Sequence, residues 1–468
     1  MYLMLTKTDF LTYLDAPMHL WAKAHDQVTK VSPTPHEQHL AQQGQDVENL
    51  ARHYLEETIV SKDDHLYWQK TFDDGRFQTR VDAILFDQNA GIYDLYEIKS
   101  STSIKKDHEY DLAYQVLLLE ALLPLRGVYL VHIDRNYTHG HQLDLESFFT
   151  IEDMTDHITK RRDEVTALRQ EALRVSQMPE PSPTFACNKP GSCPCPDLCH
   201  PNLPPHPIYQ LPYLGKKAQT LREMGILAIE DIPASFPLSS RQQQHVNAVR
   251  KGAPIIHTQP IQAALAELRY PLYFLDYETF NPAVPFFPGY RPYEHIVFQF
   301  SLFIIESPGA QPQHFEALIA NGRDPAPLIV RDLVEHLDCE GSVVVWNQSF
   351  EAGRNRDLAR HCPDYAEQLL TINERLFDLM LVFQEGHYIH PDFNGSASLK
   401  AVLPVLCPEL GYNGMTIPDG EAAMLTWYWL HCGKIPEEDR HKTIEAMKAY
   451  CKMDTYGMVA IWEKLLAL

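Results

Sequence analysis

The sequence predicts an α/β protein of more than one domain, and three observations lead to that expectation. The chain has 468 residues, which is too long for a single hydrophobic core. Strand-like and helical patterns alternate both before residue 172 and after residue 272, and a stretch rich in Pro and Cys lies between these regions. We therefore expect an α/β domain at 1–200, a helical connector at 201–270 and a second α/β domain at 271–468.

Composition and charge narrow the class of protein. Hydrophobic residues make up 45% and charged residues 22% of the chain, as in ordinary globular proteins. There is no run of about 18 apolar residues and no basic-then-apolar leader, so we expect a cytoplasmic protein without a membrane partner. The formal net charge is -22, so a nucleic-acid partner would have to be held by local basic patches or by metal ions.

The amino-terminal domain combines helical and strand patterns. Helices are expected at residues 6–24, 43–55, 107–123 and 144–172. Strands are expected at residues 67–71, 77–86, 91–98 and 127–132. The first two strands flank Asp73-Asp74-Gly75, which is a hairpin signal.

Charged side chains in this domain suit phosphodiester hydrolysis, which needs a metal held by oxygen ligands and a cation near the phosphate. Glu97 and Lys99 are spaced i, i+2 and therefore point to one face of a strand. Asp82 and Glu97 can hold Mg²⁺ or Mn²⁺, and Lys99 can orient a water molecule. Glu48 can add a carboxylate from the helix at 43–55. The alternative is a β-rich domain with surface ion pairs.

These residues resemble the motifs of the PD-(D/E)xK nuclease superfamily, and within it the RecB-like branch that includes the CRISPR-adaptation nucleases. The resemblance rests on the helix Gly44–Glu48, on Asp82 and on the strand end Glu97–Lys99. Gln115 matches part of a further family motif, although Leu119 stands where the family has Tyr. The resemblance implies a restriction-endonuclease-like fold that cuts or trims DNA, with these residues at its active site.

Four cysteines lie close together at the end of this domain. They are Cys187, Cys193, Cys195 and Cys199, in a loop rich in Pro and Gly. Thiolates this close suit Zn²⁺ or an iron–sulfur cluster better than inert core positions. The chain has nine Cys, and the other five are scattered, so a disulfide framework is not expected.

The resemblance also bears on the cysteine loop. RecB-like nucleases of this branch often hold a four-iron cluster with one early Cys and three late ones. Cys187, Cys193 and Cys199 match the late three, but residue 16, in the segment where the early Cys is expected, is Ala. Three outcomes remain open: Cys195 replaces the missing ligand, the cluster is altered, or it is lost.

The connector and the carboxy-terminal domain follow. The connector opens with several prolines and contains a short helical unit at 214–232. In the last domain, strands are expected at 273–277, 295–305, 313–318 and 341–346. Helices are expected at 326–337, 396–406 and 438–466.

The strand at 273–277 runs into two carboxylates. Asp276 and Glu278 are spaced i, i+2 and point to the same face, where they repel each other unless a cation is bound. The alternative is a strand end in solvent. Further on, Glu351 follows the strand at 341–346, and Tyr450 and Asp454 share a helix face at i, i+4.

These residues can form a site for two metal ions, Mg²⁺ or Mn²⁺, roughly 4 Å apart. Asp276 can bridge the two ions, and Glu278 and Asp454 can add ligands. Glu351 can act through a water molecule. The Tyr450 hydroxyl can orient the attacking water.

The three motifs resemble those of the DEDD exonuclease superfamily, in its Tyr-bearing branch. The resemblance covers about the last 200 residues and implies an RNase H-like fold. It rests on Asp276-x-Glu278, on Asn347 to Glu351, and on Tyr450-x-x-x-Asp454. The sequence departs from the family at residue 351, where Glu stands in place of Asp.

The order of motifs along nearly the whole chain resembles a bacterial family of two-nuclease proteins. The resemblance implies a metal-dependent nuclease with two active sites, one of them 3′–5′ exonuclease-like. Its expected partner is DNA, single-stranded or at an end. Two alternatives stay open: an RNA-processing nuclease, and a nucleic-acid-binding or assembly protein in which one or both sites are degenerate.

Overall fold

The computed structural model describes residues 4–29 and 31–468, and the chain divides into two compact units. Unit 1 comprises Met1–Asn202 and Pro282–Glu294, and unit 2 comprises Leu203–Asn281 and His295–Leu468. Both units combine sheets with helices, which confirms the multi-domain α/β class expected from the sequence. The segment expected as a connector lies almost wholly in unit 2.

Unit 1 contains a five-stranded mixed sheet with the order β2-β5-β6-β7-β8 and a small sheet with the order β1-β4-β3. The strands are β1 (Leu5–Thr6), β2 (Asp64–Trp68), β3 (Thr71–Asp73), β4 (Phe77–Arg80), β5 (Ala83–Asp87), β6 (Ile92–Lys99), β7 (Leu125–Ile133) and β8 (Phe149–Asp153). In the larger sheet only β6 and β7 pair in parallel. The hairpin expected around Asp73-Asp74-Gly75 is confirmed as β3–β4, with Gly75 at φ 83°.

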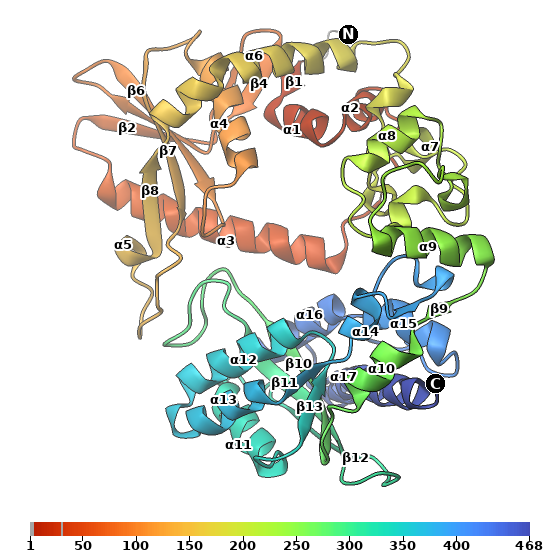
Figure 1. The fold of residues 1–468 in the computed structure, drawn as a ribbon. Coiled ribbons are helices and arrows are strands. Elements are labelled where there is room, and N and C mark those ends of the chain that lie inside the picture. The colour runs from red at the N-terminus through yellow and green to blue at the C-terminus, as the bar shows by residue number, and fades with distance from the viewer. Residues whose placement is uncertain (1–3, 30) are drawn as a thin grey trace. The chain divides into compact units, whose positions relative to one another are not determined.

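Helices cover both faces of the larger sheet (Figure 1). The helices of unit 1 are α1 (Lys7–Asp15), α2 (Pro17–Ala24), α3 (Pro35–Thr58), α4 (Lys106–Leu119), α5 (Leu145–Phe148), α6 (Thr155–Ser176) and α7 (Pro196–Cys199). Val47 and Leu55 of α3 pack against Ile98 and its neighbours on one face. Helices α1, α4 and α6 pack on the face that carries Leu95. Because side chains alternate along a strand, Glu97 and Lys99 point to the same side as Leu95, toward α4.

Unit 2 contains a five-stranded sheet with the order β12-β11-β10-β13-β14. Strands β10, β11 and β12 pair antiparallel, whereas β10, β13 and β14 pair in parallel. The strands of the unit are β9 (Ile255–Ile256), β10 (Leu272–Phe280), β11 (Ile296–Ile305), β12 (Gln313–Leu318), β13 (Ser342–Val345), β14 (Leu376–Asp378) and β15 (Tyr388–Ile389). The central strand, β10, is the one that carries Asp276 and Glu278.

Both faces of this sheet are also covered by helices (Figure 1). The helices of unit 2 are α8 (Lys217–Glu223), α9 (Ser240–Lys251), α10 (Thr258–Leu265), α11 (Ala326–His336), α12 (Gln348–His361), α13 (Ala366–Glu374), α14 (Leu381–Gln384), α15 (Leu399–Leu406), α16 (Gly420–His431) and α17 (Glu437–Leu466). Tyr273 and Leu275 face α11, α12 and α13. Leu272 and Phe274 face α10, α15 and α17, so Asp276 and Glu278 lie on the side of α17.

Three segments differ from the elements expected from the sequence. Residues 6–24 form two helices, because Pro17 cannot continue α1 and instead starts α2. Residues 144–172 contain β8, which pairs with β7 before α6 begins. Helix α16 was not expected at all. No helix in the described ranges, 4–29 and 31–468, has the length and apolarity needed to cross a membrane.

Candidate metal and catalytic sites

The carboxy-terminal candidate site lies where β10 meets α17. Asp276 and Glu278 project from the strand, and Cys451 projects from the helix. One ligand atom from each of these three residues lies within 4.8 Å of the other two. The Cys451 thiol donates a hydrogen bond to Asp276 Oδ2 over 3.7 Å. The structure thus brings together the two expected carboxylates and adds a thiol.

Helix α17 also supplies Tyr450 and Asp454, one turn apart as the sequence predicts. Asp454 accepts a hydrogen bond from the hydroxyl of Tyr412, and Tyr450 lies on the same face of α17. Lys400 Nζ lies 5.3 Å from the ring centroid of Tyr450 and 5.5 Å from that of Tyr412. The Lys400 ammonium group therefore lies near enough to act on Glu278 and Asp454.

Glu351 comes from the first turn of α12, and the fold fixes that turn. Asp378 accepts a hydrogen bond from the Gln348 backbone N–H over 3.0 Å at the start of the helix. The Tyr277 hydroxyl of β10 donates to Asn355 Oδ1 over 2.7 Å farther along it. The Glu351 side chain is 3% exposed, and its Oε2 has no hydrogen-bond partner among the described residues.

Electrostatics in this site oppose full ionisation. Burial raises the pKa of Asp276, Glu278 and Glu351 well above the usual range of carboxyl groups. The neighbouring carboxylates raise these pKa values further, since Asp454 acts on Asp276, and Asp276 acts on Glu278 and Glu351. A bound cation would relieve this repulsion.

The amino-terminal set is joined by a hydrogen-bonded ion-pair network. Lys99 Nζ lies 2.7 Å from Glu97 Oε1 and 2.6 Å from Asp111 Oδ2. Lys7 Nζ, from the first turn of α1, lies 2.9 Å from the same Glu97 oxygen. Gln115 donates through Nε2 to Glu97 Oε2 over 2.8 Å and to Asp111 Oδ1 over 2.9 Å. Both oxygens of Glu97 are thus occupied by donors from the protein.

Asp82 and Glu48 lie at the edge of this network. Asp82, in the link between β4 and β5, accepts the Ile98 backbone N–H over 2.9 Å. Glu48 accepts bonds of 2.7 Å from both Arg52 and Gln69. Among the described residues, ligand oxygens of Glu48, Asp82 and Glu97 do not all lie within 4.8 Å of one another. The structure therefore does not bring these three carboxylates together as one group of metal ligands.

Opposite shifts of pKa separate Asp82 from Glu97. Burial raises the pKa of Asp82 to about 7, and the charge of Glu97 contributes in the same direction. Burial alone would also raise the pKa of Glu97, but the ammonium groups of Lys99 and Lys7 outweigh it and lower that pKa. Glu97 is therefore the ionised member of the pair.

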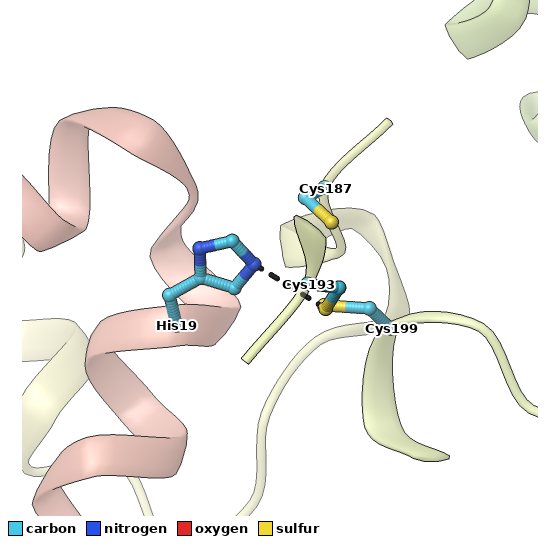
Figure 2. A group of neighbouring side chains, drawn as sticks. All are labelled: His19, Cys187, Cys193 and Cys199. Carbon is cyan, nitrogen blue, oxygen red and sulfur yellow. Dashed lines mark hydrogen bonds between the residues drawn. The ribbon is translucent and has the colours of Figure 1, made fainter. Parts of the chain in front are cut away.

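The cysteine loop forms a third candidate site, which contains a histidine. His19 of α2 lies with Cys187, Cys193 and Cys199, and one ligand atom from each lies within 4.8 Å of the others (Figure 2). This Cys/His group can hold a metal. Cys195 is not part of it, although its Sγ lies 3.7 Å from Cys199 Sγ.

Sequence reasoning missed several residues that the structure places in these sites, Tyr412 and four others. The four others are Lys7, Asp111, His19 and Cys451. Two of these had a local signal: Asp111 precedes Gln115 by one helical turn, and Cys451 lies inside the Tyr450-x-x-x-Asp454 motif. His19 lies three residues after the position at which an early Cys was expected. Lys7 had no signal in the sequence.

Comparisons with known proteins give relatives without an assigned activity. A family model described as a domain of unknown function, DUF2779, matches residues 273–398. The chain is 26% identical over 210 residues to the "Uncharacterized protein MG366 homolog" of Mycoplasma pneumoniae, covering 40% of this chain and 31% of that protein. It is 21% identical over 281 residues to the "Uncharacterized protein UU173" of Ureaplasma parvum, covering 56% of this chain and 41% of that protein. The chain thus spans well under half the length of these curated relatives. No solved structure matches it.

Proposed function

We propose that this protein is a metal-dependent nuclease that hydrolyses phosphodiester bonds, with its main active site in unit 2. The supporting observation is the convergence of buried carboxylates where β10 meets α17. Asp276 and Glu278 share a ligand group. Burial and mutual repulsion raise their pKa values, and Glu351 adds a buried oxygen without a partner among the described residues.

Mg²⁺ or Mn²⁺ fits the donor set, because hard divalent cations take carboxylate oxygens. Asp276, Glu278 and Asp454 would hold the ions, with Glu351 placed to contribute from α12. Such ions supply an activated water and neutralise charge on the phosphate. Tyr450 would orient the water through its hydroxyl, from the same face of α17 as Asp454.

We also propose a fold family for each unit. An RNase H-like fold for unit 2 is supported by three antiparallel strands continued by two parallel ones, with the acids on the central strand. A restriction-endonuclease-like fold for unit 1 is supported by the mixed sheet whose strand β6 ends in Glu97 and Lys99. We expect a nucleic-acid partner, with DNA preferred to RNA, and a cytoplasmic location.

Unit 1 would be the second nuclease site. Glu97 is the ionised acid, Lys99 and Lys7 are the cations nearest to it, and Gln115 orients its second oxygen. A second candidate function for this unit, nucleic-acid binding without cleavage, is favoured by one observation. The two lysines occupy the Glu97 oxygen that a metal ion would need.

The Cys/His group would hold a metal for structural reasons. A zinc ion or a four-iron cluster in that position would fasten the loop that contains Cys187 and Cys199 to helix α2.

Cleavage of labelled single-stranded DNA and RNA with Mg²⁺ or Mn²⁺ tests the proposal. We expect Asp276→Asn to slow cleavage by about 100-fold or more, because metal-held charge stabilisation amounts to several kcal/mol. Glu306→Gln, an exposed acid just after β11, is the matched control and should cleave like the wild type.

Two results would decide the roles of the units. If Glu97→Gln leaves cleavage intact and weakens binding, unit 1 binds without cutting. If the wild type cuts neither substrate with either metal while still binding it, the nuclease proposal fails.

A further inference from the structure

We propose that His19, Cys187, Cys193 and Cys199 form a Cys₃His centre for a single zinc ion, in place of the four-iron cluster that the sequence resemblance implies. These residues of unit 1 play no part in the proposed nuclease chemistry. A test of the zinc centre is therefore independent of a test of nuclease activity. Three features of the group carry it: the orientation of the histidine, the spacing of the donors and the position of Cys195.

The imidazole of His19 is held in the orientation of a metal ligand. Its Nδ1 lies 2.7 Å from Oδ2 of Asp15, the last residue of α1. In the neutral tautomer that donates from Nδ1 to this carboxylate, Nε2 keeps its lone pair. That Nε2 points into the cysteine group, 3.5 Å from Cys193 Sγ (Figure 2). A carboxylate on the outer nitrogen of a histidine is the usual support of a zinc-binding imidazole.

The spacing of the donors fits one ion. With Zn–S bonds of about 2.3 Å, tetrahedral geometry sets the donor atoms about 3.8 Å apart. The four donor atoms of this group all lie within 4.8 Å of one another. In a four-iron cluster each thiolate binds a different iron, so the thiolates lie farther apart than around a single ion. The cluster therefore fits this group poorly.

The neighbouring polar groups have the arrangement of an outer shell around the donors. Cys195 Sγ lies 3.7 Å from Cys199 Sγ but outside the group. His200 Nε2 lies 3.2 Å from Cys187 Sγ. The His200 imidazole can orient the Cys187 sulfur, whereas Cys195 lies beside the group without belonging to it. The thiols of Cys187 and Cys199 are buried in an apolar cluster with Trp21.

Four protein ligands leave no open coordination position, which marks a structural zinc rather than a catalytic one. Its role would be to join α2 to the loop that follows α6. Trp21 adds a second link between the same segments, since its Nε1 donates to the Met178 carbonyl over 2.8 Å.

Metal analysis of the full-length chain tests the nature of the occupant. The protein is purified without air from cells supplied with both zinc and iron, and dialysed against a weak chelator that removes carboxylate-bound ions. We expect about one zinc ion per chain and a colourless protein without iron or labile sulfide. Stoichiometric iron and sulfide, or a chain without zinc, would overturn the proposal.

Substitutions test the ligand set. We expect His19→Ala to lose the zinc and Cys195→Ser, the matched control in the same loop, to keep it. Asp15→Asn lies on the half-exposed outer side, so it leaves the packing intact, and it should weaken zinc affinity by about 10- to 100-fold. Loss of zinc in Cys195→Ser with retention in His19→Ala would contradict the assignment.

If His19→Ala does not fold, a variant that keeps four ligands can test the same ligand. His19→Cys should still bind one ion. After replacement of zinc by Co²⁺, its visible ligand-field bands should shift relative to those of the wild type, because a nitrogen donor becomes sulfur. Unchanged bands would show that residue 19 is not a ligand.

Discussion

Glu97 is stabilised by two ammonium groups on one oxygen and by an amide on the other. The side chain is 1% exposed, so its charge would be costly without these partners. Lys99 comes from the same strand and was expected from the sequence, whereas Lys7 comes from the first turn of α1. The charge of this site therefore depends on a residue far from it in the sequence.

We predict that Lys7→Gln lowers the Mg²⁺ concentration needed for half-maximal activity of the unit 1 site. Lys7 Nζ lies 2.9 Å from Glu97 Oε1, where it competes with a cation for the same oxygen. The effect is measured by metal titration of cleavage in an Asp276→Asn background, which silences the unit 2 site. Lys62→Gln, an exposed position of the same unit, is the control. An unchanged or higher metal requirement would contradict competition.

Helix α1 carries Lys7, and its start is defined by a capping box. Thr6 Oγ1 accepts the Asp9 backbone N–H over 3.1 Å, and the Asp9 side chain accepts the Thr6 backbone N–H over 3.0 Å. Lys23 of α2 adds an ion pair of 2.7 Å to Asp9. The cap therefore fixes the helix terminus at which Lys7 meets Glu97.

We predict that Thr6→Ala destabilises unit 1 by about 1 kcal/mol, the usual cost of losing a capping side chain. Urea unfolding followed by circular dichroism measures the change. Thr8→Ala, at an exposed position of the same helix, should leave stability unchanged or raise it slightly, since Ala favours helices. Equal losses in the two variants would assign the effect to the helix surface and not to the cap.

Sequence patterns predicted most elements because their signals are local. The strand at 313–318 and the hairpin at Asp73-Asp74-Gly75 are examples in which alternation or turn residues suffice. The break at Ala16 was missed because helical periodicity continues across Pro17, although the proline ring ends α1 there. Strand β8 was missed because it is short and lies between helices α5 and α6, so the whole stretch was expected as one helix.

The candidate sites were predicted to the extent that their motifs are contiguous. Asp276 with Glu278, and Tyr450 with Asp454, follow from fixed spacings on a strand and a helix. The pairing of His19 with Cys193 could not be predicted in this way, because only the fold brings α2 to the cysteine loop. Whether the nuclease chemistry itself is present stays a prediction.

At the scale of the whole molecule, buried neutral histidines link stability to pH. His245 of α9 is 8% exposed, and its Nε2 has no partner among the described residues. Burial, and then the charge of Arg241, lowers its pKa from 6.5 to about 4. In the unfolded chain the same group takes up a proton below about pH 6.5. Folding is therefore opposed as the pH falls from 6.5 toward 4.

We predict that His245 alone reduces the free energy of unfolding of unit 2 by up to about 1.4 kcal/mol per pH unit below pH 6.5, levelling off near pH 4. Urea unfolding of the full chain at several pH values measures the slope. His245→Phe removes the titrating group and should flatten the profile, whereas His257→Phe, an exposed position, should not. A profile with the wild-type slope in His245→Phe would exclude this residue as the cause.

Residues 282–294 belong to unit 1, so a single cut of the chain cannot separate the two units. Ala283 donates its backbone N–H to Gln43 Oε1 over 2.7 Å, and the Tyr293 hydroxyl donates to the Ser100 carbonyl, directly after Lys99. The polypeptide thus leaves unit 1 after Asn202 and returns to it within the β10–β11 connection. Truncation after Asn202 removes part of the surroundings of Glu97 and Lys99. Unit 1 is covalently complete only in a chain that continues through Glu294.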